Sequence, residues 1–179
     1  MPSSKFKKLA DSSDNSGQEK IRQSLAQTAI RFLSYKSRFR EEISKRLENE
    51  IKKKNYPSTS SRLISPILDK LEKNHLLNDE ELVKDYINYY LKEKLKGPYF
   101  IKQILILKNA PSDLIEENLT KLATPEAQGE AINTFLQKKL VKTKVVDRKE
   151  REKLIRQLKS RGFDFHLILK KIDECVQIG

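Results

Sequence analysis

The stretch AIRFL at residues 29–33 decides the fold, because its pattern of apolar side chains returns twice further along the chain. The related stretches are INYYL at residues 87–91 and INTFL at residues 132–136. In each copy, three apolar side chains stand at positions i, i+3 and i+4, which places them on one stripe of a helix. A pattern that occurs three times in a chain of 179 residues predicts a repeat protein.

Two pairs of apolar residues follow each copy, and the members of every pair are four residues apart. The first pairs are Ile43 with Leu47, Ile101 with Leu105, and Leu154 with Leu158. The second pairs are Ile64 with Leu68, Ile115 with Leu119, and Ile168 with Ile172. Each pair predicts one further helix. Differences in spacing between the copies fall between the predicted helices, so each copy is predicted to be a three-helix unit.

The predicted fold class is therefore all-α, with three tandem three-helix repeats forming an elongated, curved stack. Stacking matters because a three-helix unit of about 50 residues buries little apolar surface by itself. We expect a flexible polar N-terminal tail at residues 1–22. The three repeats are expected at residues 23–77, 78–123 and 124–179.

Proline, glycine and asparagine mark several predicted helix ends. Pro98, directly after Gly97, suits the first turn of a helix, where a missing N–H breaks no hydrogen bond. Gly162 and Asn109 follow two predicted second helices, at positions where the chain commonly adopts a positive φ. These residues support helices that begin and end where the apolar pairs predict.

The composition excludes several classes of protein. The chain has 37 Lys and Arg against 25 Asp and Glu, a net charge of +12. A single cysteine, Cys175, excludes an intrachain disulfide and a cysteine-based metal site. No stretch has the apolar length that a membrane span or a signal peptide requires. We therefore expect a soluble, cytoplasmic protein without a metal or a cofactor.

Residues that could carry catalysis are few and scattered. His75 and His166 lie in different predicted repeats, and neither stands near a nucleophile and a carboxylate at a useful spacing. The five glycines are too far apart to form a phosphate-binding loop. The sequence therefore favours a binding or regulatory protein over an enzyme.

The positive charge follows the predicted repeats. Residues 31–54, 92–108 and 138–161 carry net charges of +5, +4 and +8, whereas residues 69–85 and 112–134 carry −3 and −4. Basic segments that occur once in each repeat would lie on corresponding surfaces and form a stripe that binds a polyanion. For a single segment, a solvated helix face with ion pairs between its own turns is the better explanation. Three segments in register favour the binding stripe.

The candidate contacts to a polyanion are basic residues of these three segments: Arg31, Lys36, Arg38 and Arg40 in the first repeat, Lys94, Lys96 and Lys102 in the second, and Lys142, Lys144, Arg148, Arg151, Arg156 and Arg161 in the third. The aromatic residues that flank the segments would either stack on bases or belong to the core: Tyr35, Phe39, Tyr99 and Phe100. The sequence has no zinc-finger spacing or other base-reading motif, so the expected contact with nucleic acid is nonspecific and made to phosphates.

Four groups of residues, in this order, resemble the RecX family of recombinase regulators. They are AIRFL at residues 29–33 followed by Lys36, Arg38, Glu42, Ile43 and Leu47; LLNDE at residues 76–80; Gly97 and Pro98 with Ile101 and Leu105; and Arg161, Gly162 and Phe163 with Ile168. The resemblance extends from about residue 26 to residue 176. The chain departs from the family pattern at Phe39, where a small hydroxyl residue is usual, and at Lys36, Asn78 and Asn109.

The resemblance implies a curved, all-helical protein of three tandem repeats that has no catalytic residues of its own. It further implies that the chain binds the RecA–DNA filament along its groove and inhibits ATP hydrolysis, strand exchange and coprotease activity in recombination, DNA repair and the SOS response. The expected partners of the monomeric chain are the RecA filament and, weakly and nonspecifically, single- or double-stranded DNA. Two alternatives stay open: a nonspecific DNA-binding helical protein without a recombinase partner, and a repeat scaffold that docks acidic proteins.

Overall fold

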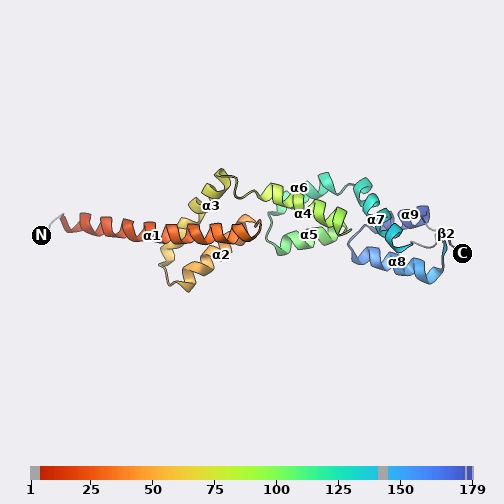
Figure 1. Ribbon diagram of the computed structural model, residues 1–179, viewed down its shortest axis with the longest axis horizontal. Coiled ribbons are helices and arrows are strands. Elements are labelled where there is room, and N and C mark those ends of the chain that lie inside the picture. The colour runs from red at the N-terminus through yellow and green to blue at the C-terminus, as the bar shows by residue number, and fades with distance from the viewer. Residues whose placement is uncertain (1–4, 141–144, 176, 179) are drawn as a thin grey trace. The chain divides into compact units, whose positions relative to one another are not determined.

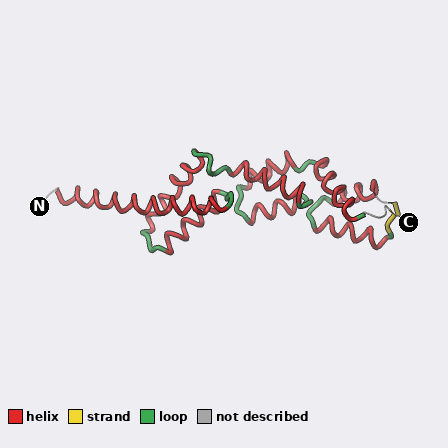
Figure 2. The backbone as a smooth tube through the Cα atoms, viewed as in Figure 1, coloured by secondary structure: helices red, strands yellow, loops and turns green. Residues whose placement is uncertain are grey.

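The computed structural model describes residues 5–140, 145–175 and 177–178, with side chains over residues 16–140 and 147–175. The chain divides into two compact units, which we call unit 1 (Met1–Asn78) and unit 2 (Asp79–Gly179). Nearly all of the described backbone is helical, with nine α helices in the described residues (Figures 1 and 2). The predicted all-α fold is confirmed.

Unit 1 is a three-helix set. Its elements are α1 (Lys5–Tyr35), α2 (Arg40–Lys53), the short 3-10 helix η1 (Ser58–Leu63) and α3 (Ile64–Lys73). Figure 1 shows α2 and α3 beside the C-terminal half of α1. The apolar stripe of α1 is buried there, since Leu25 and Ala29 have no exposed surface, and the same holds for Ile43 and Leu47 of α2. These side chains and those of α3 form one hydrophobic core.

Helix α1 corrects the predicted tail at residues 1–22, because residues 5–22 are helical; residues 1–4 lie outside the described part of the chain. No proline interrupts residues 5–22. Arg22 donates two hydrogen bonds, each 2.8 Å long, to the carboxylate of Glu19 one turn earlier. Each residue added to an existing helix gains a backbone hydrogen bond, so the helix continues past its last buried turn. The polar composition therefore marks where burial ends, and the helix extends further.

Unit 2 contains two more sets of three helices. The first set is α4 (Asp79–Asn88), which continues into the π-helical turn η2 (Tyr89–Glu93), with α5 (Pro98–Leu107) and α6 (Ser112–Leu122). The second set is α7 (Pro125–Lys139), α8 (Arg148–Ser160) and α9 (Phe165–Cys175). Each of the three predicted repeats contains one set, and their division into separate domains stays a prediction.

Two short strands of unit 2 were not expected from the sequence. β1 (Val145–Val146) and β2 (Gln177–Ile178) pair in parallel, with Val145 opposite Gln177. A pair of two-residue strands is too short to leave an alternating pattern of apolar and polar residues, so the sequence predicts none. The pairing brings the backbone before α8 next to the backbone after α9.

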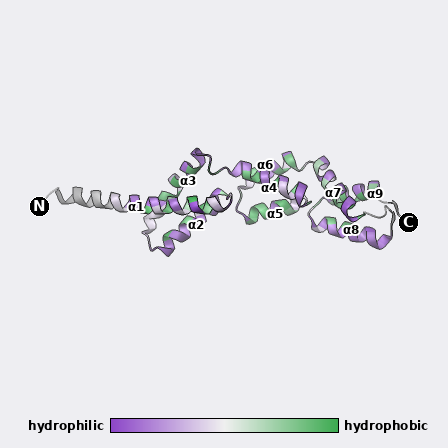
Figure 3. Cartoon of the chain, in the orientation of Figure 1, coloured by the Kyte–Doolittle hydropathy of each residue, from purple (hydrophilic) through white to green (hydrophobic). Residues whose placement is uncertain are grey.

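Burial in unit 2 follows the predicted apolar pairs. Ile101 and Leu105 of α5 have no exposed surface, and neither have Ile168 and Ile172 of α9. Figure 3 shows α5 as a strongly hydrophobic helix. The periodicity read from the sequence therefore identifies the faces on which the helices of unit 2 pack.

Several helices are each followed by a residue in the left-handed backbone conformation. In the part of the chain that the structure describes, five residues have a positive φ, and each stands two positions beyond the last residue of a helix: Asn55, His75, Leu95, Asn109 and Gly162. After Asn109, the Ala110 N–H donates to the Leu105 carbonyl oxygen at 3.0 Å, and after His75, the Leu76 N–H donates to the Leu71 carbonyl oxygen at 2.9 Å. These bonds satisfy carbonyls that have no partner inside the helix. The left-handed ends predicted at Gly162 and Asn109 are confirmed, as is Pro98 at the start of α5.

Replacing His75 with glycine is expected to stabilise the chain. His75 is exposed and has a φ of 55°, a conformation in which a Cβ atom clashes with the following carbonyl oxygen. Removing that clash outweighs the greater freedom that glycine gives the unfolded chain, so the free energy of unfolding should rise by about 0.5–1 kcal/mol. Urea denaturation measures the free energy of unfolding of the unmodified chain, of His75→Gly and of His75→Ala, a control that keeps the Cβ atom. Equal stability of the two variants would contradict this reading of the helix end.

Candidate functional site

The motifs around Gly97 and Gly162 meet in unit 2. The Gly97 N–H donates to the Arg161 carbonyl oxygen at 2.8 Å. The Tyr99 N–H donates to the Gly162 carbonyl oxygen at 3.2 Å. A Cβ atom on Gly97 would lie 2.2 Å from the Gly162 carbonyl oxygen, and one on Gly162 would lie 2.4 Å from the Phe100 nitrogen. The two backbones cross so closely that only glycine fits at either position.

The Arg161 side chain fixes the same crossing. Its Nη1 atom donates to the carbonyl oxygens of Lys94, at 2.9 Å, and of Leu95, at 3.1 Å. Its Cζ atom lies 4.6 Å from the centroid of the Phe135 ring. The last carbonyls of a helix have no partner within the helix, so Arg161 completes the end of η2 from the following helix set. A residue predicted to contact a polyanion is thus also a structural link inside unit 2.

Four cations and three aromatic rings surround this crossing, and we call them the junction surface: Lys94, Lys96, Lys139 and Arg161 with Tyr89, Phe100 and Phe135. The Nζ atom of Lys96 lies 4.1 Å from the Phe100 ring centroid, and that of Lys94 lies 5.2 Å from the Tyr89 centroid. The Nζ atom of Lys139 lies 6.0 Å from the Phe135 centroid. Among the side chains that the structure describes, none of the four cations forms an ion pair with a carboxylate.

The protonation equilibria of the two junction lysines on either side of Leu95 reflect their surroundings. Partial burial, and then the nearby charge of Arg161, lower the pKa of Lys96 below its ordinary value. A hydrogen bond with the Tyr89 hydroxyl raises the pKa of Lys94. Lys96 and Arg161 repel one another, and neither forms an ion pair with a described carboxylate. An anion bound between them would relieve this repulsion, so the pair attracts one. The junction surface can therefore bind phosphate or carboxylate groups next to the exposed ring of Tyr89.

Other predicted contact residues link the second helix of a set to the third. The pairs are Arg40 with Asp69 and Glu72 (2.6 and 2.8 Å), Lys102 with Glu116, and Arg151 with Asp173 (2.6 Å). Arg40 and Arg151 precede the apolar pair of their helix by the same number of residues, and Asp69 and Asp173 directly follow theirs. The same ion pair is thus built into the first and third sets.

Arg38 is also engaged within the chain. It forms an ion pair with Glu42 at 3.3 Å, and its Cζ atom lies 4.3 Å from the Phe32 ring centroid. Next to it, Phe39 is fully buried, and its N–H donates to the Glu42 carboxylate at 3.2 Å. Phe39 therefore belongs to the core. Of the flanking aromatics that were open to either role, Tyr35 and Tyr99 are exposed and remain able to stack on a ligand.

The remaining predicted contact residues project into solvent or fall outside the described residues. Arg31 and Lys36 are exposed at the end of α1. The side chains of Arg148 and Arg156 are 91% and 71% exposed and share Glu152 as a partner. Lys142 and Lys144 lie outside the described residues. Of the predicted residues, the structure brings together Lys94, Lys96 and Arg161.

Lys139 and Tyr89 belong to the junction surface although neither was among the predicted contact residues. Lys139 ends α7 and lies within the basic segment of residues 138–161, so its charge was visible in the sequence. Its place beside Phe135 and Arg161 depends on how α7 packs, which the charge pattern does not give. Within the described residues, no group of three His, Cys, Asp or Glu side chains could hold a metal ion. No described helix combines the length and apolarity needed to cross a membrane.

Replacing Arg40 with glutamine is expected to affect stability more than binding. Loss of the pairs with Asp69 and Glu72, both partly exposed, should lower the free energy of unfolding by about 1 kcal/mol. Lys36 is exposed and forms no ion pair among the described side chains, so Lys36→Gln should leave stability unchanged. If Lys36 contacts phosphates as the sequence predicts, the same variant should weaken binding to a labelled oligonucleotide about twofold. Urea denaturation and fluorescence anisotropy on both variants test this contrast. Weaker DNA binding by Arg40→Gln at unchanged stability would contradict the structural role.

Comparison with known proteins gives a consistent result. A family model described as the third three-helix domain of RecX matches residues 126–172. The regulatory protein RecX of Bacillus pumilus is 34% identical over 150 residues, which are 83% of this chain and 54% of that protein. RecX of Bacillus subtilis is 31% identical over 147 residues, 82% of this chain and 53% of that protein. The chain thus spans about half the length of the curated relatives it matches.

A solved structure extends the likeness to three dimensions. The crystal structure of RecX from Lactobacillus salivarius superposes with a TM-score of 0.72 and 26% sequence identity, covering 88% of this chain and 97% of that chain. A second crystal structure of a regulatory protein RecX gives a TM-score of 0.66 at 25% identity. Helical repeats of the same kind therefore occur in experimentally solved proteins.

Proposed function

Because this chain belongs to the RecX family of regulatory proteins, we propose that it binds the RecA–DNA filament and inhibits ATP hydrolysis, strand exchange and coprotease activity. The observation that carries the proposal is the junction surface, where four cations stand together without a carboxylate partner among the described side chains. The chain acts as a regulator by occupying the filament, in the cytoplasm, and without chemistry of its own.

The junction surface suits a polymer of negative charges better than a single small anion. Its cations come from the end of η2, the end of α7 and the end of α8, so they are spread over several elements. Each contact between one cation and one phosphate or carboxylate is weak in water. Several weak contacts on one compact unit act together, which raises the overall affinity without any single strong site.

We assign the other predicted residues to two groups. Arg31, Lys36, Arg148 and Arg156 are exposed and extend the binding surface, and Lys142 and Lys144 join this group by their place in the sequence. Arg40, Lys102 and Arg151 chiefly hold helices together through their intrachain ion pairs, and Arg38 is engaged by Glu42 and by the Phe32 ring of α1. Inhibition should therefore depend on the exposed group and on the junction surface.

An alternative function is nonspecific DNA binding without a recombinase partner. The exposed ring of Tyr89 beside Lys94 favours it, because single-stranded bases stack on such rings next to phosphate-binding cations, and Tyr99 offers a second exposed ring. In that case the chain would reduce RecA activity only by competing for DNA.

Titration at raised salt separates these functions. Binding to naked DNA falls steeply with salt, so a concentration exists at which this chain no longer binds an oligonucleotide. The chain is then added to preformed RecA filaments on single-stranded DNA under those conditions, and ATP hydrolysis is followed. The proposal predicts that hydrolysis still falls as the chain is added. Loss of inhibition together with loss of DNA binding would support the alternative.

A further inference from the structure

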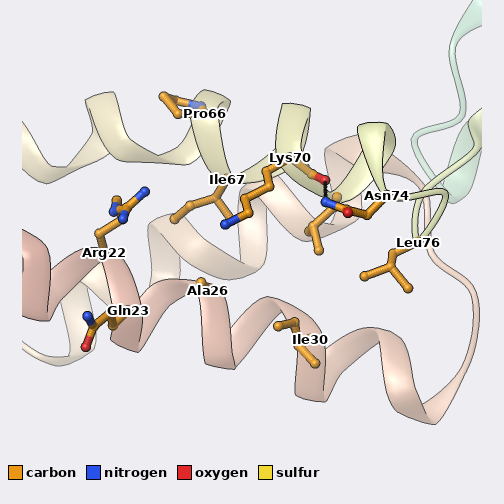
Figure 4. Close-up of a pocket in the computed structure, with 10 residues that line it drawn as sticks. Arg22, Gln23, Ala26, Ile30, Pro66, Ile67, Lys70, Asn74 and Leu76 are labelled. Carbon is orange, nitrogen blue, oxygen red and sulfur yellow. Dashed lines mark hydrogen bonds between the residues drawn. The ribbon is translucent and has the colours of Figure 1, made fainter.

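Helices α1 and α3 of unit 1 leave an apolar groove between them, with a cavity of about 260 Å³ (Figure 4). Ala26 of α1 and Ile67 and Leu71 of α3 form its floor. At one end, Ile30 and Leu76 line the groove and are 52% and 56% exposed. Large aliphatic side chains left in water at the edge of an apolar cavity are typical of a surface that a partner covers.

Two cations reach into the same groove. Arg22 from α1 and Lys70 from α3 both line it, and Figure 4 shows their charged ends in the space between the two helices. Arg22 is paired with Glu19 at 2.8 Å, whereas Lys70 forms no ion pair among the side chains that the structure describes. The groove therefore combines an apolar floor with an excess positive charge.

The dimensions of the groove fit a short helix. From Arg22 to Ile30 the groove follows α1 for about 12 Å, which is about two helical turns. A cavity of about 260 Å³ holds a few aliphatic side chains and is small for a drug-sized ligand. An amphipathic helix would place apolar residues at i, i+4 and i+7 into such a groove.

The charges identify the chemistry of that helix. A nucleic acid backbone would leave Ile30 and Leu76 uncovered, because phosphates cannot bury aliphatic side chains. A second copy of this chain carries a net charge of +12 and would be repelled. A partner helix with carboxylates beside its apolar residues would pair with Lys70 and cover the apolar floor. We propose that the α1–α3 groove of unit 1 binds an acidic amphipathic helix of a partner protein.

This proposal is independent of the junction surface and is tested with a synthetic probe. The probe is a fluorescein-labelled, alanine-based helical peptide with leucine at i, i+4 and i+7 and glutamate at the flanking positions. A second peptide has lysine in place of each glutamate. Fluorescence anisotropy with the full chain should show that the glutamate peptide binds at least about tenfold more tightly than the lysine peptide. Lys70 attracts the glutamates of the first peptide and repels the lysines of the second.

Variants of the full chain locate the binding site. Lys70→Glu should weaken binding of the glutamate peptide about tenfold, and Ile30→Ser should weaken it about fivefold through lost apolar contact. The matched controls Lys53→Glu and Ile106→Ser change exposed residues outside the groove and should leave binding unchanged. The NMR chemical shifts of the backbone amides give a second readout that needs no variant. When the glutamate peptide is added to the unmodified chain, these shifts should change at residues 22–30 and 66–76.

Three results would overturn the proposal. Equal binding of the two peptides would remove the role of charge. Unchanged binding by both Lys70→Glu and Ile30→Ser, with amide shifts elsewhere, would place the peptide outside the groove. Self-association of the unmodified chain that Ile30→Ser abolishes, measured by sedimentation, would show that a second copy occupies the groove.

Discussion

Replacing Gly97 with alanine is expected to lower the free energy of unfolding of unit 2 by about 3 kcal/mol or more. The new methyl group would lie 2.2 Å from the Gly162 carbonyl oxygen and 2.4 Å from the Phe163 nitrogen, which are both backbone atoms. A backbone turn cannot rotate aside as a flexible side chain can. The two turns must therefore separate, which breaks the hydrogen bond from Gly97 to Arg161. Urea denaturation followed by circular dichroism measures the loss.

Two other glycines serve as controls. A Cβ atom on Gly17 would meet nothing within 4 Å, so Gly17→Ala should stabilise α1 slightly, by about 0.5–1 kcal/mol. A Cβ atom on Gly129 would meet only the Lys171 side chain, which can move, so Gly129→Ala should cost far less than Gly97→Ala. Unfolding of Gly97→Ala at the same urea concentration as the unmodified chain would show that the crossing is looser than the structure has it.

The sequence predicts the helices of this protein well because burial imposes a period on them. Apolar pairs such as Ile101 with Leu105 lie on the face that packs, and their spacing identifies that face without knowledge of the partner helix. Helix ends are equally local. Asn109 and Gly162 adopt positive φ for reasons contained in their own turns, so residue type alone identifies them.

Contacts between distant residues could not be predicted in the same way. Gly97 and Gly162 were each identified as helix-end residues, but nothing in either turn indicates that they meet. Arg40 and Lys94 look alike in the charge pattern, although Arg40 forms ion pairs with two carboxylates and Lys94 forms none among the described side chains. Net charge counts cations in a segment, whereas a binding surface depends on which cations lack an intrachain partner.

Reversing the charges of the junction lysines is expected to abolish most of the regulatory effect. The variant Lys94→Glu/Lys96→Glu/Lys139→Glu replaces three cations of the junction surface and keeps Arg161, which supports the fold. Each reversed charge turns an attraction to a polyanion into a repulsion, so the concentration for half-inhibition of RecA ATP hydrolysis should rise about tenfold or more. Helicity and the unfolding midpoint should change little, because none of the three lysines forms an ion pair among the described side chains.

A matched control separates the surface from the overall charge. The variant Lys53→Glu/Lys73→Glu/Lys170→Glu changes three exposed lysines outside the junction surface. Both triple variants lower the net charge from +12 to +6. If only the overall charge matters, both triple variants should lose inhibition equally. If the junction surface is the binding site, only the junction variant should lose inhibition.

The most direct test is therefore the half-inhibition concentration of both triple variants on preformed RecA filaments, at a salt concentration that eliminates binding to naked DNA. A loss of about tenfold or more for the junction variant, with the control within about twofold of the unmodified chain, is the predicted result. Equal inhibition by all three proteins, or an equal loss for both variants, would contradict a binding role for the junction surface.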